Sequence, residues 1–202
     1  GFSAGTITAT LNGSATSATT AGTVTTAAQP NITSVGTLTS LTVSGALTTT
    51  QITTGANTTA GNITGNWTLT SGSRLQATYA DLAEYYAADK HYPAGTVLDF
   101  AGEQEVTVAG IESNKIAGVV SADPAYVMNG MIKCEHPVAI ALQGRVPCKV
   151  RGKVRKGDMM ISAGDGFAKA ANSEPKMGTV IGKALANFDG DEGVIEVVVG
   201  RL

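Results

Sequence analysis

The stretch TSGSRLQATYADLAEYYAADK, residues 70–90, contains the point at which the composition of the chain changes. No charged side chain precedes Arg74, whereas all 14 Lys and Arg and all 16 Asp and Glu of the 202-residue chain lie from Arg74 onward. The first 73 residues contain 23 threonines among many glycines, serines and alanines, and the remaining 129 have the composition of a globular domain. The break therefore divides the chain into two segments, 1–73 and 74–202.

Residues 1–73, called the stalk below, hold too few apolar side chains to fold alone as a compact domain. Only 14 large apolar residues lie in this segment, and burying them gives less free energy than ordering 73 backbones costs. Threonine is β-branched and favours strands, and the glycines mark turns between short strands. We therefore expect an elongated β-rich stalk in which several copies of the chain wind together, either triple-stranded, spiral or β-helix-like.

At the junction with residues 74–202, called the head, a short helix is expected over Thr78–Lys90. Thr78 can cap the helix with Asp81 three residues on, which is a variant of the capping box. Apolar side chains recur at the helical spacing i, i+3, i+4, i+7, at Tyr79, Leu82, Ala83 and Tyr86.

Beyond this helix, short β-rich runs dominate the head and are separated by Gly, Asp, Asn and Pro. The runs are GTVLDF, QEVTVAGI, IAGVVSA, HPVAIALQGRVPCKV, GDMMISA, GFAKAA, GTVIGKAL and GVIEVVVGRL. A spacing of about 8–12 residues between such runs is typical of an all-β sandwich or barrel.

Several of these stretches together resemble a known family. ATYADLAEYY, PAGTVLDF, KIAGVVSADPAYVMNG, VAIALQGRVPCKVRGKVRKGDMMISAGDGFAKAA and GTVIGKAL resemble the C-terminal head domain of bacteriophage tail fibres and appendages, the intramolecular chaperone type classed as peptidase G2. The resemblance covers roughly Ala77–Leu202, and AAQPNITSVGTLTSLTVSG, residues 27–45, resembles stalk sequence of tailed-phage fibres. It implies a head that trimerises, nucleates folding of the stalk, forms the fibre tip and in some members cuts itself off.

The resemblance also implies a candidate catalytic pair, Asp81 and Glu84. In autocleaving members an aspartate of the motif that ADLAE matches acts in cutting the chain a few residues upstream, which places the bond near Ala77-Thr78. Residues three apart would share a face of the expected helix, and a carboxyl group with a tuned pKa can act as general acid or base. The alternative is a solvated acid pair near a helix N-terminus. Because LQATYA, residues 75–80, offers no evidently labile bond, we expect cleavage to be absent or very slow.

A second candidate site is the basic stretch RVPCKVRGKVRK, residues 145–156, which contains no acid. Its cations are Arg145, Lys149, Arg151, Lys153, Arg155 and Lys156. Apolar and basic residues alternate, so one strand face is apolar and the other cationic. The cationic face can bind phosphate groups of a host surface glycan, pair with the acidic stretch Asp189–Glu196 of a neighbouring subunit, or be a solvated face that discourages edge aggregation.

Global properties exclude several classes of function. A net charge of −2 at pH 7 gives no general attraction to nucleic acid or to anionic membranes. An aromatic content of 5% argues against a stacking platform for nucleic acid, and no apolar run reaches the length of a membrane span. His91 and His136 lack zinc-ligand spacing. We expect no metal, no cofactor, no nucleic acid and no membrane insertion.

The expected protein is therefore the C-terminal fragment of a longer virion protein, since the chain begins at Gly1-Phe2. Its expected partners are two further copies of itself and the upstream part of the fibre or other virion proteins. Cys134 and Cys148 are expected to be buried thiols and not a disulfide, which suits assembly in the reducing cytoplasm of a bacterial host. Two alternatives stay open: an autoproteolytic chaperone domain, and a receptor-binding tip that recognises a host surface glycan.

Overall fold

The computed structural model describes residues 34–50, 52 and 65–200, and they divide into two units between Asn66 and Trp67. In the first unit the described residues 34–50 form no strand. Their large apolar side chains, together with that of Ile52, are 46–69% exposed in this single chain. The stalk prediction concerns three chains wound together, and it stays a prediction.

The second unit is all-β, as expected for the head. Its strands are β1 (Asp81–Ala87), β2 (Val97–Asp99), β3 (Thr107–Val108), β4 (Ile116–Val120), β5 (Tyr126–Met128), β6 (Pro137–Arg151), β7 (Met159–Gly164), β8 (Phe167–Ala170), β9 (Val180–Ala184) and β10 (Glu192–Val199). Within the described residues no helix is present. Consequently, none of the described residues form a helix that is long and apolar enough to cross a membrane.

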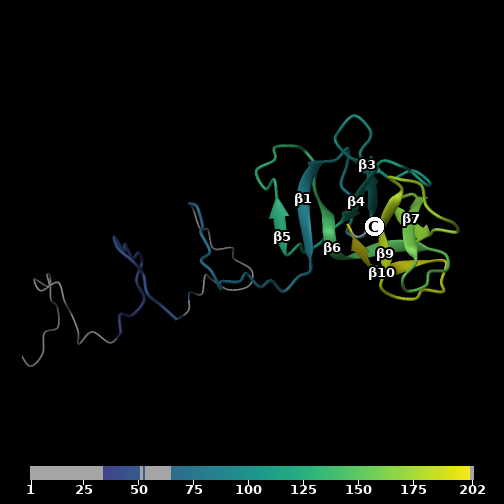
Figure 1. Ribbon diagram of the computed structural model, residues 1–202. Helices are drawn as coiled ribbons and strands as arrows, with labels where there is room; N and C mark the ends of the chain where they lie inside the picture. Colours follow the sequence, from purple (N-terminus) through teal and green to yellow (C-terminus); the bar gives the residue numbers. More distant parts are fainter. Residues whose placement is uncertain (1–33, 51, 53–64, 201–202) are drawn as a thin grey trace, which may run out of the picture. The chain divides into compact units, whose positions relative to one another are not determined.

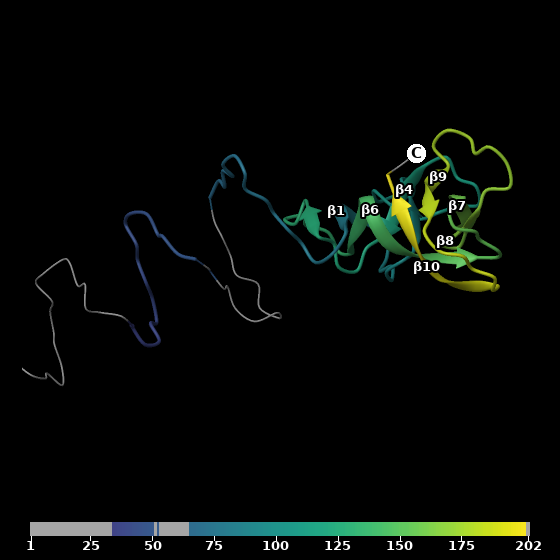
Figure 2. The same ribbon diagram turned by 60° about the horizontal axis from the view of Figure 1, so that its bottom comes forward.

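The second unit is built around the long strand β6, which pairs with four other strands (Figure 1). The N-terminal half of β6 pairs antiparallel with β1 and with β4. The C-terminal half pairs antiparallel with β10 over eight residue pairs and parallel with β8 at Val150. The order β10–β9–β7–β8–β6 therefore closes on itself through the β6–β10 pairing, and Figure 2 shows β10 running beside β6. The result is a closed five-stranded barrel.

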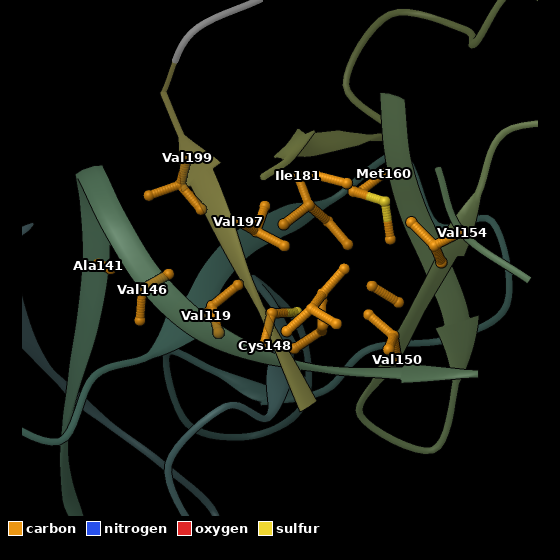
Figure 3. Close-up of a cluster of buried hydrophobic side chains, with 14 of the residues drawn as sticks. Val119, Ala141, Val146, Cys148, Val150, Val154, Met160, Ile181, Val197 and Val199 are labelled. Carbon is orange, nitrogen blue, oxygen red and sulfur yellow. The ribbon is translucent and has the colours of Figure 1, made fainter. Parts of the chain in front are cut away.

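The interior of this barrel is filled by alternate residues of its strands. On β6, Val146, Cys148 and Val150 are fully buried. Arg145, just before Val146, and Pro147, between Val146 and Cys148, are exposed. This alternation confirms the two-faced strand expected from the sequence. Figure 3 shows the three buried side chains facing others that come from the rest of the barrel, among them Val154, Met160, Ile181 and Val197.

The remaining strands extend the sheet from the N-terminal half of β6. On one edge β6 continues through β4 and β2 to β3, and on the other edge it continues through β1 to β5. A second apolar cluster lies here, formed by Ala88, Tyr92, Leu98, Val106, Val120, Val138 and Ile140. The strands β1 and β5 are called the wing below, and in Figure 1 they lie on the side of β6 away from β7 and β9.

The helix expected over Thr78–Lys90 is wrong, because most of this stretch is the strand β1. β1 pairs antiparallel with β6 and parallel with β5, so both of its edges carry ladder hydrogen bonds. Asp81 and Ala83 are buried and Leu82 between them is not, which is the period of two of a strand. The helix preference of Ala, Leu and Glu is weak, and long-range pairing overrides it here.

Candidate functional site

The N-terminal end of β1 is held tightly against β6, at the place where the chain enters the head. Asp81 pairs with Gly144 in the β1–β6 register, and the Arg145 amide donates to the Ala80 carbonyl at 3.1 Å. Gly144 has φ +108°, and a Cβ at this position would collide with the Ala80 carbonyl oxygen. Only glycine therefore allows the backbone at Ala80–Asp81 to approach this closely.

A cavity of about 430 Å³ opens at this point of the head. It is lined by the segment Thr78–Asp81 and, among others, by the charged residues Asp123, Arg145 and Glu196. Three carboxyl groups and one guanidinium thus share one cavity, called the Asp81 cavity below. Arg145 and Glu196 form an ion pair at 3.6 Å between Nη1 and Oε2.

The carboxyl group of Asp81 is the buried acid of this cavity. Asp81 is only 5% exposed, and its Oδ2 has no hydrogen-bond partner among the described residues. A buried carboxyl oxygen without a donor is costly, and a catalytic role is one of the explanations for such a group in a native protein. Thr78, on one side of the expected cleavage bond, lines the same cavity. General acid–base catalysis by this carboxyl group would require it to come within hydrogen-bond reach of the bond, directly or through one water.

Glu84, the second residue of the predicted pair, lies elsewhere. Three residues along a strand place two side chains on opposite faces, so the shared face expected from a helix is absent. Glu84 accepts a hydrogen bond of 2.8 Å from the Tyr86 hydroxyl and does not line the Asp81 cavity. Burial, followed by this hydrogen bond, raises the pKa of Tyr86 to about 12. The structure brings Glu84 together with Tyr86, and not with Asp81.

The three arginines of the basic stretch pair with acids of the same chain. The ion pairs are Arg145–Glu196, Arg151–Glu192 and Arg155–Asp189. All three acids belong to the stretch Asp189–Glu196 that the sequence suggested as a partner in a neighbouring subunit. They reach the arginines within one chain because β10 pairs with β6.

The three lysines of this stretch are placed differently from the arginines. Lys149 donates from Nζ to the Thr96 hydroxyl at 2.9 Å. Lys153 contributes to lowering the pKa of Asp189, behind the larger effect of the hydrogen bond from Arg155. The Lys156 backbone amide donates to Asn187 Oδ1 at 2.9 Å. Binding of a host glycan and pairing between subunits both stay predictions. Lys153 and Lys156 are the cations best placed for either role, because the arginines and Lys149 already use their side chains within the chain.

Two features of the Asp81 cavity were missed by sequence reasoning. Asp123 and Glu196 lie more than 70 residues apart in the sequence, and neither was connected with Asp81. The signal that could have been used for Glu196 is its outward position on an alternating strand. Its position at the cavity follows from the β6–β10 register, which the local pattern does not contain.

The two cysteines are free thiols, as expected. Cys148 is fully buried in the barrel, whereas Cys134 is half-buried, so the expectation of two buried thiols holds for Cys148 alone. No group of three or more His, Cys, Asp or Glu side chains within the described residues is arranged to hold a metal ion.

The sequence matches no family model. No curated protein matches it either. Among solved structures, the chain is similar to the pre-mature bacteriophage phi29 gene product 12, with a TM-score of 0.46 and 14% sequence identity over 64% of this chain and 23% of that one. It is also similar to the C-terminal fragment of bacteriophage phi29 gene product 12, with a TM-score of 0.42 and 16% identity over 59% of this chain and 99% of that one. The chain therefore spans about a quarter of the first of these structures.

Proposed function

We propose that this chain is a structural part of a phage tail fibre or related virion appendage, assembled in the cytoplasm of the bacterial host. Its head brings three chains together, starts the folding of the stalk and forms the tip. The proposal rests on the sequence resemblance of the head and the stalk to such fibres.

The observation that carries the proposal is the contrast between the two units. The head has its own buried core inside a closed barrel. The described stalk side chains Val35, Leu38, Leu41, Val43 and Leu47 are all about half exposed or more in the single chain. Apolar side chains in such a row gain nothing from folding unless other chains cover them. A head that folds first and holds three chains in register supplies those neighbours.

The mass of the native chain tests this proposal. Light scattering after size exclusion should give about three times the chain mass of 20.4 kDa. Residues 74–202 alone should fold and form trimers, and residues 1–73 alone should be unfolded or aggregated. A folded monomer whose stalk amides are protected from hydrogen exchange would overturn the proposal, as would stable trimers of the stalk fragment alone.

A second candidate function, slow self-cleavage, is supported by the buried and unpartnered Asp81 carboxyl oxygen at the cavity that Thr78 also lines. In this reaction a water adds to the carbonyl carbon of Ala77 and the bond to the Thr78 nitrogen breaks. Asp81 would take a proton from the water and return one to the leaving nitrogen. The products are a new carboxyl group on Ala77 and a new amino group on Thr78.

Intact mass after incubation for days across pH 4–9 tests this candidate. A product of residues 78–202 that is absent in Asp81→Asn, but still formed in Glu84→Gln, would establish it, because Asp81 lines the cavity and Glu84 does not. We expect no such product, or one that accumulates very slowly, because LQATYA, residues 75–80, offers no evidently labile bond. An unchanged mass in both variants and in the natural chain would leave assembly as the function of the head.

A further inference from the structure

The outer strand of the wing has an apolar surface that nothing in its own chain covers. β5 pairs with β1 and with no other described strand, so one of its edges is free. Tyr126 and Val127 on β5 are 64% and 37% exposed, and Met131 just beyond it is 88% exposed. These three residues are called the wing patch below.

Hydrogen bonds to β1 hold the segment that carries the wing patch, although the side chains of the patch are exposed. The Ala125 amide donates to the Asp81 carbonyl at 2.8 Å, and the Asn129 side-chain amide donates to the Tyr85 carbonyl at 2.9 Å. Asn129 has φ +56°, which turns the chain directly after the strand. The segment is therefore fixed on β1 at both ends.

The composition of this segment is unusual for a free strand edge. No charged residue lies between Asp123 and Lys133. Soluble proteins protect free edges with charges, bulges or covering loops, since a bare apolar edge promotes association. Other exposed apolar side chains of the head, such as Met177 at 97% and Val194 at 60%, stand apart in the sequence, and isolated ones are ordinary. The wing patch gathers three within six residues.

Two observations indicate what covers the wing patch. Because the segment has no charge, identical copies can meet there without like-charge repulsion, and a strongly charged partner gains nothing from it. The wing also contains β1, the first strand after the stalk. In the proposed trimer each chain passes from the stalk into the wing at β1, which pairs with β5.

From these observations we propose that the wing patch is the contact by which the heads of neighbouring copies of this chain associate. Because neighbouring residues of a strand point to opposite faces, Tyr126 of each copy packs against one neighbouring wing and Val127 against the other around the common axis, and Met131 lies just beyond the strand. The inference rests on the proposed trimeric function, and it names the surface that makes the trimer. Tyrosine and methionine are among the residues enriched in the buried centres of protein interfaces.

The double variant Val127→Lys/Met131→Lys of the full chain tests this surface. It places two cations per chain in a contact where three chains meet, and it should reduce the mass in solution from about three times 20.4 kDa to that of one chain, or raise the dissociation constant at least tenfold. High salt should restore part of the association, because it screens the added charges. The matched control Met177→Lys changes an equally exposed methionine outside the wing, and it should leave the trimer intact.

A second variant and a folding check keep the outcome clear. Met131→Lys alone alters a side chain that is 88% exposed, so it should not disturb the fold of one chain, yet it should weaken the trimer measurably. Cys148, which is fully buried in the barrel, should stay unreactive toward thiol reagents in every folded variant. If the natural chain is a trimer and both lysine variants keep the same mass and melting temperature, the wing patch is not the contact, while the proposed function stands. If the natural chain is a monomer, the proposed function itself is overturned.

Discussion

Arg151 and Glu192 stand directly opposite each other in the β6–β10 ladder, at the end of the pairing that closes the barrel. The guanidinium donates from Nε and from Nη2 to the same carboxylate oxygen of Glu192, at 3.0 Å and 2.8 Å. It also lies over the Phe167 ring, 4.5 Å from its centroid, and forms an ion pair with Asp165 at 3.3 Å. One side chain therefore connects β6 with β10 and with the β7–β8 turn.

A double-mutant cycle on Arg151→Ala and Glu192→Ala measures how much this pair stabilises the closed barrel. The side chains are 38% and 52% exposed, so we expect the small coupling free energy that is typical of ion pairs at the surface. The coupling should shrink in high salt. Arg151→Ala alone should cost more than Glu192→Ala alone, because it also removes the contacts with Phe167 and Asp165. Equal losses in the two single variants would contradict this expectation.

Gly144→Ala tests the close approach of the chain at the entrance to the head. The new Cβ would meet the Ala80 carbonyl at a φ of +108°, so the free energy of unfolding should fall by roughly 3 kcal/mol or more. Gly152→Ala is the control, because Gly152 also has a positive φ, +75°, but nothing lies within 4 Å of its added Cβ. That variant should lose only about 1 kcal/mol from backbone strain. Equal losses in denaturant titrations of the two variants would show that the contact with Ala80 is unimportant.

The two thiols should differ sharply in reactivity. Burial raises the pKa of the Cys148 thiol to about 12, so almost no thiolate forms at pH 8 and reagents cannot reach it. Cys134 is half-buried and reachable. In the native protein a thiol reagent should modify Cys134 and leave Cys148 intact, whereas both should react in denaturant. Peptide mapping by mass spectrometry identifies the modified residue, and rapid native labelling of Cys148 would contradict the closed barrel.

The loss of stability at acid pH should depend on the protonation of two carboxyl groups, those of Asp89 and Asp189. Burial acts to raise the pKa of Asp89, but hydrogen bonds from Tyr92 and Thr107 outweigh it and lower this pKa below its usual value. A hydrogen bond from Arg155 lowers the pKa of Asp189. A carboxyl group with a lowered pKa stabilises the folded state above its ordinary pKa, and this contribution is lost as the pH falls through the folded value. Stability should therefore fall with decreasing pH below about 5.

Asp89→Asn and Asp189→Asn should each flatten this acid limb. Denaturant titrations at pH 7, 5, 4 and 3 provide the measurement, with the natural chain in the same buffers as the reference. An unchanged slope in both variants would show that the hydrogen bonds of these carboxylates do not differ between the folded and unfolded states.

Local patterns of the sequence predicted the strand content of the head and the two-faced character of β6. Val146, Cys148 and Val150 alternate with polar or exposed neighbours, and one face of a half-buried strand must read in this way. The stretch from Tyr79 to Tyr86 was wrongly predicted to be a helix, because its apolar residues fit a helical period as well as they fit a strand. What decides its structure is the presence of two partner strands, β5 and β6, that lie far away in the sequence.

For the candidate sites, too, the sequence indicated the residues of local motifs but not the neighbours that strand pairing brings to them. Asp81 could be named because it belongs to a local motif, whereas its burial and the nearby Glu196 depend on how β1, β6 and β10 are joined. From the sequence, one alternative was that the basic stretch pairs with Asp189–Glu196 of a neighbouring subunit, and this pairing between subunits stays a prediction. The sequence did not indicate that the three arginines pair with these acids within one chain, because that requires the register of β10 on β6.

The pairing of β6 with β10 also sets an order of events during protein synthesis. The barrel lacks one wall until the residues of β10, through Val199, have left the ribosome, although β6 is complete nearly fifty residues earlier. In the proposed order of assembly, the Thr-rich residues 1–73 are therefore made before the head of the same chain can close. That segment carries no charged side chain and only 14 large apolar ones. The composition from which we infer that the stalk cannot fold alone thus also gives it few groups with which to bind other molecules before the last strand of the barrel is in place.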